Sequence, residues 1–318
     1  MSSDPKLLEG SIAVSQPFDL DVCLNSGQAF AWFQRENAWL GAIRQTAFAL
    51  RQEKDRLFYH TSAPSFPESD ALLRHYFALD DDYEKIRRRL PRDPFLRSAM
   101  RFGAGLRILR QDPWECLAGF ILSSAKQIVH IRQIWQEVAR RWGMPLELRG
   151  EGEGVAQPPP AVKKNTAGGG CATWLPVYSF PDPDKMAVLS EADLRSCGMG
   201  FRAPYLLHAA QQIAGGEPDL ASLRNLPVEK AREKLMRLRG VGQKIADCAL
   251  LFSLGKNEAF PVDTWILRVL RRVYFRNKRR VRPARLRSFA AGHFGPHGGL
   301  AQQYLFHYAR MHPHFLAR

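Results

Sequence analysis

Short apolar stretches fill the first sixty residues and are separated by polar turns. Apolar and polar side chains partly alternate in them, and aromatic residues are frequent, which is typical of strands with one buried face. The stretches are AWLGAI (38–43), AFALRQ (47–52) and LFYHTS (57–62). The pattern predicts an antiparallel sheet in this part of the chain.

Beyond Pro67 the apolar residues recur three and four positions apart, which is the spacing of an amphipathic helix. Asp112 can cap one of these helices, with Pro113 in its first turn. Helical spacing resumes at Glu191 and continues to the C-terminus, with one interruption around 276–283. The first helical segments are PESDALLRHYFAL (67–79), DYEKIRRRL (82–90) and DPWECLAGFILSSAKQIVHIRQIWQEVARRW (112–142).

The order of these patterns predicts an α+β fold. We expect a β-rich N-terminal domain with flanking helices over residues 1–105. A large α-helical body of two subdomains should follow over 106–318. Residues 146–173 are rich in glycine and proline and poor in large apolar side chains, so we predict a flexible insertion there.

Charge points to a polyanionic partner. The 318 residues carry 46 Lys and Arg against 31 Asp and Glu, a net charge of +15. Residues 268–287 hold ten basic side chains and no acidic one. Such an excess favours nucleic acid as the binding partner, and an acidic membrane surface as the second choice. A basic surface that only contacts solvent is the simpler interpretation.

No apolar run is long enough to span a membrane, and MSSDPKLLEG lacks the pattern of a secretory signal. We therefore expect an intracellular monomer without a membrane partner, in the cytoplasm or nucleoid of a bacterium or the nucleus of a eukaryote. The five cysteines are scattered and form no CxxC pair, which argues against disulfides, zinc and iron–sulfur clusters. We predict neither a metal nor a cofactor.

The segment VEKAREKLMRLRGVGQKIADCALLFSLG (228–255) predicts a helix, a tight turn and a second helix. Gly240 and Gly242 allow the turn, and the free amides where the second helix begins, around Ile245, can hold a DNA phosphate. A nucleotide-binding P-loop fits poorly, because Lys244 is followed by Ile245 and no Ser or Thr is available for a metal.

Lys244 and Asp263 add candidate chemistry to this hairpin. A lysine in the first turn of a helix lies near the positive end of the helix dipole, which favours the neutral, nucleophilic amine. Asp263 in FPVDTW is placed to cap the next helix. A phosphate contact for Lys244 and capping alone for Asp263 are the simpler interpretations. As a pair, however, they suit attack at the anomeric carbon of a nucleotide.

LRGVGQKIADC followed by PVD resembles the helix-hairpin-helix Gly/Pro-Asp (HhH-GPD) superfamily of DNA glycosylases, and more narrowly the 8-oxoguanine DNA glycosylases. The resemblance extends from about Phe18 to Phe306, apart from 146–173, and implies a TBP-like N-terminal domain. Its other segments are LNSGQAFAW (24–32), ILRQDPWECL (108–117), SSAKQI (123–128), GMGFRAPYL (198–206) and AQQYLF (301–306).

The resemblance implies a bifunctional glycosylase and AP lyase that acts on double-stranded DNA containing oxidised guanine. Lys244 would attack C1′ of a flipped nucleotide, expel the base and leave a Schiff base that undergoes β-elimination. Asp263 would stabilise the oxocarbenium-like transition state. The implied base-binding residues are Gly27, through its carbonyl, Cys248 and Phe306 on the two faces of the base, Gln302 at its Watson–Crick edge, and Phe120 at the pocket floor.

For Phe306 and Cys248, ordinary core packing remains the alternative, and for Gly27 a simple turn. Phe201 matches the family's wedge between stacked bases, and Arg202 a contact to bases or phosphates. An asparagine and an arginine that contact the opposite cytosine in the family are replaced here by Ala125 and His130. Contacts to the opposite base would then come from Lys126, Gln127 or His130.

Two other functions stay open. One is an HhH-GPD glycosylase with another damaged-base specificity; the other is a non-catalytic helix-hairpin-helix DNA-binding protein. Lys244 argues against monofunctional glycosylases, which lack that lysine. The C-terminal ARMHPHFLAR has no four-cysteine cluster of the endonuclease III type.

Overall fold

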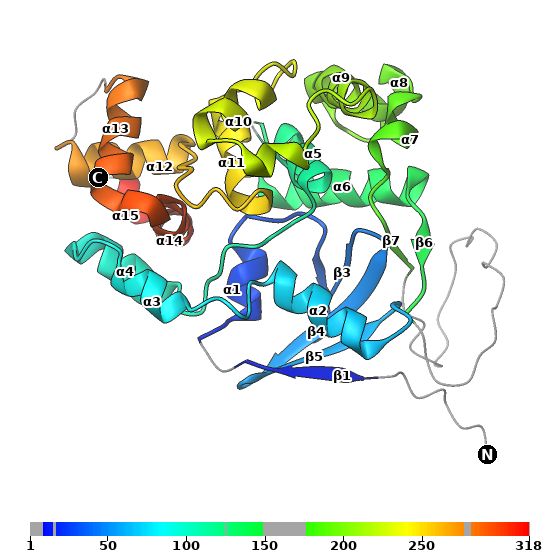
Figure 1. Cartoon of the computed structure of the whole chain (residues 1–318), viewed down its shortest axis with the longest axis horizontal. Coiled ribbons are helices and arrows are strands. Elements are labelled where there is room, and N and C mark those ends of the chain that lie inside the picture. The colour runs from blue at the N-terminus through cyan, green and yellow to red at the C-terminus, as the bar shows by residue number, and fades with distance from the viewer. Residues whose placement is uncertain (1–8, 15–16, 125, 149–175, 277–280, 318) are drawn as a thin grey trace.

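The computed structural model describes residues 9–14, 17–124, 126–148, 176–276 and 281–317. The sheet occupies the lower part of the molecule in Figure 1, and most of the helices lie above it. Of the predicted insertion, 149–173 lies outside the described residues, as does Ala125. Short strands at its ends, β6 (Pro145–Leu146) and β7 (Val177–Tyr178), pair antiparallel.

The N-terminal sheet has five antiparallel strands in the order β1-β5-β4-β3-β2. Its three central strands confirm the alternating stretches of the sequence. The two edge strands were not predicted, because each is too short to show a clear alternation. The strands are β1 (Gly10–Ala13), β2 (Phe33–Arg35), β3 (Ala38–Ile43), β4 (Thr46–Glu53) and β5 (Arg56–Thr61).

Helices make up most of the remaining chain, with α1 placed between the first two strands. They are α1 (Leu20–Asn25), α2 (Phe66–Tyr76), α3 (Tyr83–Arg88), α4 (Pro94–Phe102), α5 (Pro113–Leu122), α6 (Ile128–Trp142), α7 (Pro183–Ala187), α8 (Glu191–Ser196), α9 (Ala203–Ala214), α10 (Val228–Leu235), α11 (Gln243–Ser253), α12 (Thr264–Val269), α13 (Pro283–Phe294), α14 (Gly298–Met311) and α15 (Pro313–Ala317). Short 3₁₀ turns occur at Gly200–Arg202, Ser222–Asn225 and Gly295–His297, and a π-helical turn at Leu270–Tyr274.

Two predicted helix limits were wrong. The pattern over 112–142 is two helices, since α5 ends at Leu122, where the Ser123 hydroxyl bonds the Phe120 carbonyl, and α6 begins at Ile128. Helical structure resumes at Pro183, earlier than the expected Glu191. The helices α1 and α4 were also missed.

Two large clusters of buried apolar side chains form separate cores. One core lies against the sheet and contains Trp32, Phe48 and Tyr59. The larger core joins the helices and includes Leu96 and Ala99 of α4, which packs on α14. Packing thus groups α4 with the helical body. The predicted domain boundary near residue 105 lies after α4 and assigns this helix to the N-terminal domain.

The cap of α5 gives a stability test. Asp112 Oδ1 accepts hydrogen bonds from the amides of Trp114 (2.9 Å) and Glu115 (3.1 Å). Asp112→Ala should lower the free energy of unfolding by about 1 kcal/mol in denaturant titration. The control is Arg44→Ala, because Arg44 pairs with Asp112 Oδ2 at 3.1 Å but is 68% exposed, and it should cost less than about 0.5 kcal/mol. Equal losses would assign the effect to the ion pair.

Candidate active site

The predicted hairpin is formed by α10, a turn and α11. Gly240 has φ +82°, and a Cβ there would lie 2.4 Å from Cγ of Tyr205, so only glycine fits. Gly242 is the N-cap residue of α11, and a Cβ built on it meets no atom within 4 Å. Both glycines are exposed. The start of α11 therefore presents amides on an open surface, as an anion site requires.

Lys244 lies in the first turn of α11 and reaches across to the end of α5. Its Nζ donates a hydrogen bond to Ser123 Oγ at 2.8 Å and lies 5.0 Å from the centre of the Phe120 ring. The Ser123 hydroxyl in turn donates to the Phe120 carbonyl at 2.7 Å. The proton of that hydroxyl is thus engaged, and its oxygen is left to accept from the amine. Ser123 was not predicted as a site residue.

Asp263 is the N-cap residue of α12, which confirms the capping prediction. Its Oδ1 accepts a hydrogen bond from the amide of Ile266 at 2.8 Å. Burial raises the pKa of the Asp263 carboxyl, while that amide and the nearby charge of Lys244 act to lower it. The carboxylate is therefore fixed in orientation and poorly hydrated, where its charge acts strongly on neighbours.

A cavity of about 940 Å³ joins these two side chains to all of the predicted base-binding residues. Its size is that of a pocket for a small molecule or a single nucleotide. The predicted residues on its lining are Gly27, Phe120, Lys126, Gln127, Lys244, Cys248, Asp263, Gln302 and Phe306. Residues from opposite ends of the chain thus meet at one site.

The cavity walls combine apolar surfaces with a glutamine whose side-chain oxygen is unsatisfied. Gln302 and Phe306 lie one turn apart on α14, as predicted. Gln302 is 4% exposed, and its Oε1 accepts no hydrogen bond from any described residue. Burial raises the pKa of the Cys248 thiol to about 12, against the lowering effect of Lys244, so the sulfur is neutral. Gly27 has φ +81°, and a Cβ there would lie 3.1 Å from the Phe306 ring.

The remaining predicted residues lie around this cavity. Phe201 is 53% exposed, as a wedge requires. Arg202 turns inward, donating to the carbonyls of Met199 (3.2 Å) and Ser124, so a contact with DNA would require it to leave them. Ile245 is buried and can offer DNA only its backbone. His130 is exposed and does not line the cavity.

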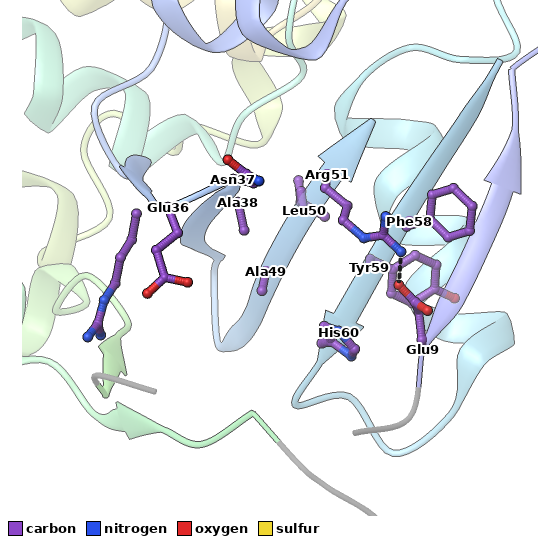
Figure 2. Close-up of a pocket in the computed structure, with 11 residues that line it drawn as sticks. Glu9, Glu36, Asn37, Ala38, Ala49, Leu50, Arg51, Phe58, Tyr59 and His60 are labelled. Atoms are coloured by element: carbon purple, nitrogen blue, oxygen red, sulfur yellow. Dashed lines mark hydrogen bonds and ion pairs between the residues drawn. The ribbon is translucent and has the colours of Figure 1, made fainter. Parts of the chain in front are cut away.

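A smaller cavity of about 260 Å³ lies on the sheet (Figure 2). It contains none of the predicted site residues. One of its two arginines, Arg51, is paired with Glu9 at 2.7 Å and lies 4.5 Å from the Phe58 ring centre. None of the described residues that line this cavity is a lysine, so it does not offer the amine that the predicted chemistry requires.

The described ranges contain no cluster of three His, Cys, Asp or Glu side chains that could hold a metal ion. Within the same ranges, every helix is too short or too polar to cross a bilayer. The four cysteines that lie there, Cys23, Cys116, Cys197 and Cys248, are buried free thiols.

Two family models match almost the whole chain. The 8-oxoguanine DNA glycosylase N-terminal domain matches residues 11–117. The HhH-GPD superfamily of base excision DNA repair proteins matches residues 118–289. The chain belongs to the HhH-GPD superfamily. Its N-terminal match and its solved neighbours place it beside the 8-oxoguanine glycosylases within that superfamily.

Among solved structures, MBOgg1 in complex with a low-affinity DNA ligand has a TM-score of 0.83 and 30% identity, over 98% of this chain and 100% of that one. The 8-oxoguanine glycosylase/lyase of Clostridium acetobutylicum, bound to double-stranded DNA with cytosine opposite 8-oxoG, has a TM-score of 0.81 and 31% identity, over 96% and 98%. A "Probable N-glycosylase/DNA lyase" of Methanothermobacter thermautotrophicus is 34% identical over 65% of this chain. The chain spans 64% of the length of that curated relative and also of the Arabidopsis thaliana N-glycosylase/DNA lyase.

One ion pair supports the hairpin from inside. Asp247 of α11, 2% exposed, accepts from Arg232 of α10 at 2.6 Å. Asp247→Ala should lower the free energy of unfolding by about 3–5 kcal/mol, because it leaves a largely buried guanidinium without its carboxylate. Glu229→Ala, which removes the exposed second partner at 3.8 Å, should cost less than about 1 kcal/mol in the same titration. Similar costs for both would show that the buried pair does not hold the hairpin.

Proposed function

We propose that this protein removes 8-oxoguanine from duplex DNA with Lys244 as nucleophile and then nicks the strand by β-elimination. The observation that carries the proposal is the single cavity that holds Lys244, Asp263 and the residues suited to grip a base. The similarity to the C. acetobutylicum glycosylase/lyase along nearly the whole chain supports it.

In this reaction the neutral Lys244 amine forms a bond to C1′ as the C1′–N9 bond breaks. The electron pair of that bond leaves with the base, which takes up a proton. The amine nitrogen loses its proton, and opening of the sugar ring gives the Schiff base. Loss of a proton from C2′ then expels the 3′ phosphate. Ser123 accepts a hydrogen bond from Nζ at 2.8 Å and so fixes the direction of the amine.

Asp263 would stabilise positive charge that develops on the sugar. Its carboxylate is already oriented by the amide of Ile266, so no reorganisation is needed as the charge forms. Burial removes water that would weaken this attraction. Asp263 thus combines capping with an electrostatic role.

Recognition of the base would use the rest of the cavity. Phe306 and Cys248 would face the two sides of the base, and the unpartnered Gln302 Oε1 would accept a hydrogen bond from its edge. The carbonyl of Gly27 would accept the N7–H that 8-oxoguanine has and guanine lacks. Phe120, on the lining beside Lys244, would form the floor.

Contacts with the duplex would be distributed around the cavity mouth, with the protein acting as a monomer. The net charge of +15 favours binding to the backbone, and the amides at Gly240, Gly242 and Ile245 would hold one phosphate. The exposed Phe201 ring would enter between stacked bases. Contacts to the opposite base would come from Lys126 and Gln127, which precede α6, and from His130 in its first turn.

Borohydride trapping on a duplex that contains 8-oxoguanine tests the nucleophile. The wild-type protein should form a covalent adduct, and Lys244→Gln should form none, because reduction of the Schiff base requires the Lys244 nitrogen. Lys230→Gln is the matched control, since Lys230 is exposed and pairs only with Glu233. Absence of both adduct and nicking with each of the four opposite bases would disprove the assigned substrate.

Phe306→Ala tests the base pocket. Base–aromatic stacking contributes about 1–3 kcal/mol, so the single-turnover rate of 8-oxoguanine excision should fall about 10- to 100-fold. Binding to undamaged duplex should not change, because the ring lies inside the cavity. Phe66→Ala, on α2, is the control for loss of a half-exposed ring. An unchanged excision rate in Phe306→Ala would remove Phe306 from the pocket.

A further inference from the structure

The carbonyl groups that precede Gly27, from the last turn of α1 to Ser26, are held one by one. Around Gly27, the neighbouring carbonyls all accept hydrogen bonds, whereas no described residue donates to the carbonyl of Gly27 itself. The accepting carbonyls and their donors are Cys23 with Ser26 Oγ (2.9 Å), Leu24 with Arg132 Nη2 (2.6 Å), Asn25 with Arg310 Nη2, Ser26 with Gln303 Nε2 (2.8 Å) and Gln28 with Gln111 Nε2 (2.8 Å).

Two of these donors, Gln303 and Arg310, line the same cavity. Arg132 belongs to α6, whereas Gln303 and Arg310 belong to α14. The Arg310 guanidinium also lies 5.9 Å from the centre of the Phe306 ring. One side chain therefore touches both the end of α1, just before Gly27, and the ring proposed to stack on the base.

The two arginines are costly to place here. Neither forms an ion pair with a described carboxylate, and the Nε of each is buried without a hydrogen-bond partner. Burial lowers the pKa of both guanidiniums, and their mutual repulsion lowers that of Arg132 further. Their acceptors are the carbonyls of Leu24 and Asn25, in the last turn of α1, and the Asn25 side chain. Two partly buried guanidiniums without a described carboxylate partner thus meet at one helix end, which indicates a functional constraint there.

We infer that Arg132 and Arg310 are positioning residues that hold the last turn of α1, and with it the residues up to Gly27, so that the Gly27 carbonyl stays free and fixed as the acceptor for N7–H of 8-oxoguanine. This inference rests on the proposed function. A rigid, unpaired acceptor in a dry pocket rejects a base that presents a lone pair instead of an N–H, because the acceptor would then stay buried without a partner. Neither arginine need touch the substrate.

The test compares two reactions of the full-length protein that share the nucleophile. One is single-turnover excision of 8-oxoguanine from duplex DNA, and the other is nicking of a duplex with a preformed abasic site, which has no base to recognise. In Arg310→Gln and Arg132→Gln, excision should fall about 10- to 100-fold, since a shift of about 1 Å can cost about 100-fold in rate. Nicking at the abasic site should keep the wild-type rate.

Arg97→Gln is the matched control, because it removes one exposed positive charge from α4 and should leave both rates unchanged. Should Arg310→Gln not fold, Arg310→Lys keeps the charge, lacks the guanidinium fork and should show the same selective loss. Unchanged excision, or a parallel loss of excision and nicking, would overturn the inference. A wild-type protein that nicks abasic sites but spares 8-oxoguanine would instead disprove the proposed substrate, and the inference with it.

Discussion

The active-site geometry depends on the packing of α5 against α11. The rings of Phe120 and Phe252 stack between these helices with centroids 5.5 Å apart. At one end of the pair, the Gln111 amide donates to the Phe252 carbonyl at 2.9 Å; at the other, Lys244 reaches Ser123. The amine is thus positioned by the packing of α11 against α5 and by the residue that caps α5, which favours accurate placement of a nucleophile.

Two polar groups of the cavity differ in how the fold satisfies them. Asp263 keeps a carboxylate in a poorly hydrated place, where it accepts from the amide of Ile266, whereas Gln302 leaves one oxygen without a described partner. A ligand that supplies a hydrogen-bond donor would satisfy that oxygen. Elsewhere, as at Gln28, the side-chain oxygen and nitrogen are both bonded within the fold. Gln28 thus contributes its hydrogen bonds to the fold, whereas Gln302 keeps an acceptor available at the cavity.

Periodicity predicted the central strands, the hairpin and the cap at Asp263, because each depends on residues close in sequence. Periodicity did not predict residues whose role depends on contacts between segments far apart in the sequence. The hydrogen bond of Ser123 with Lys244 joins residues that are 121 positions apart in sequence. Those of Arg132 and Arg310 with α1 join residues that are 108 and 285 positions apart. No local pattern marks these three side chains. The predicted base-binding residues could be named only from resemblance to a family, since each alone has the sequence context of ordinary core.

Two neighbouring residues lie between the proposed DNA wedge, Phe201, and the proposed nucleophile, Lys244. Arg202 follows the exposed Phe201 and donates to the carbonyl of Ser124. The preceding residue, Ser123, accepts from the Lys244 amine. Any movement of Arg202 toward a duplex must release Ser124, and the hydrogen bond that orients the amine lies one residue away. Ser123 and Ser124 thus connect the residue next to the proposed wedge with the amine proposed as the nucleophile.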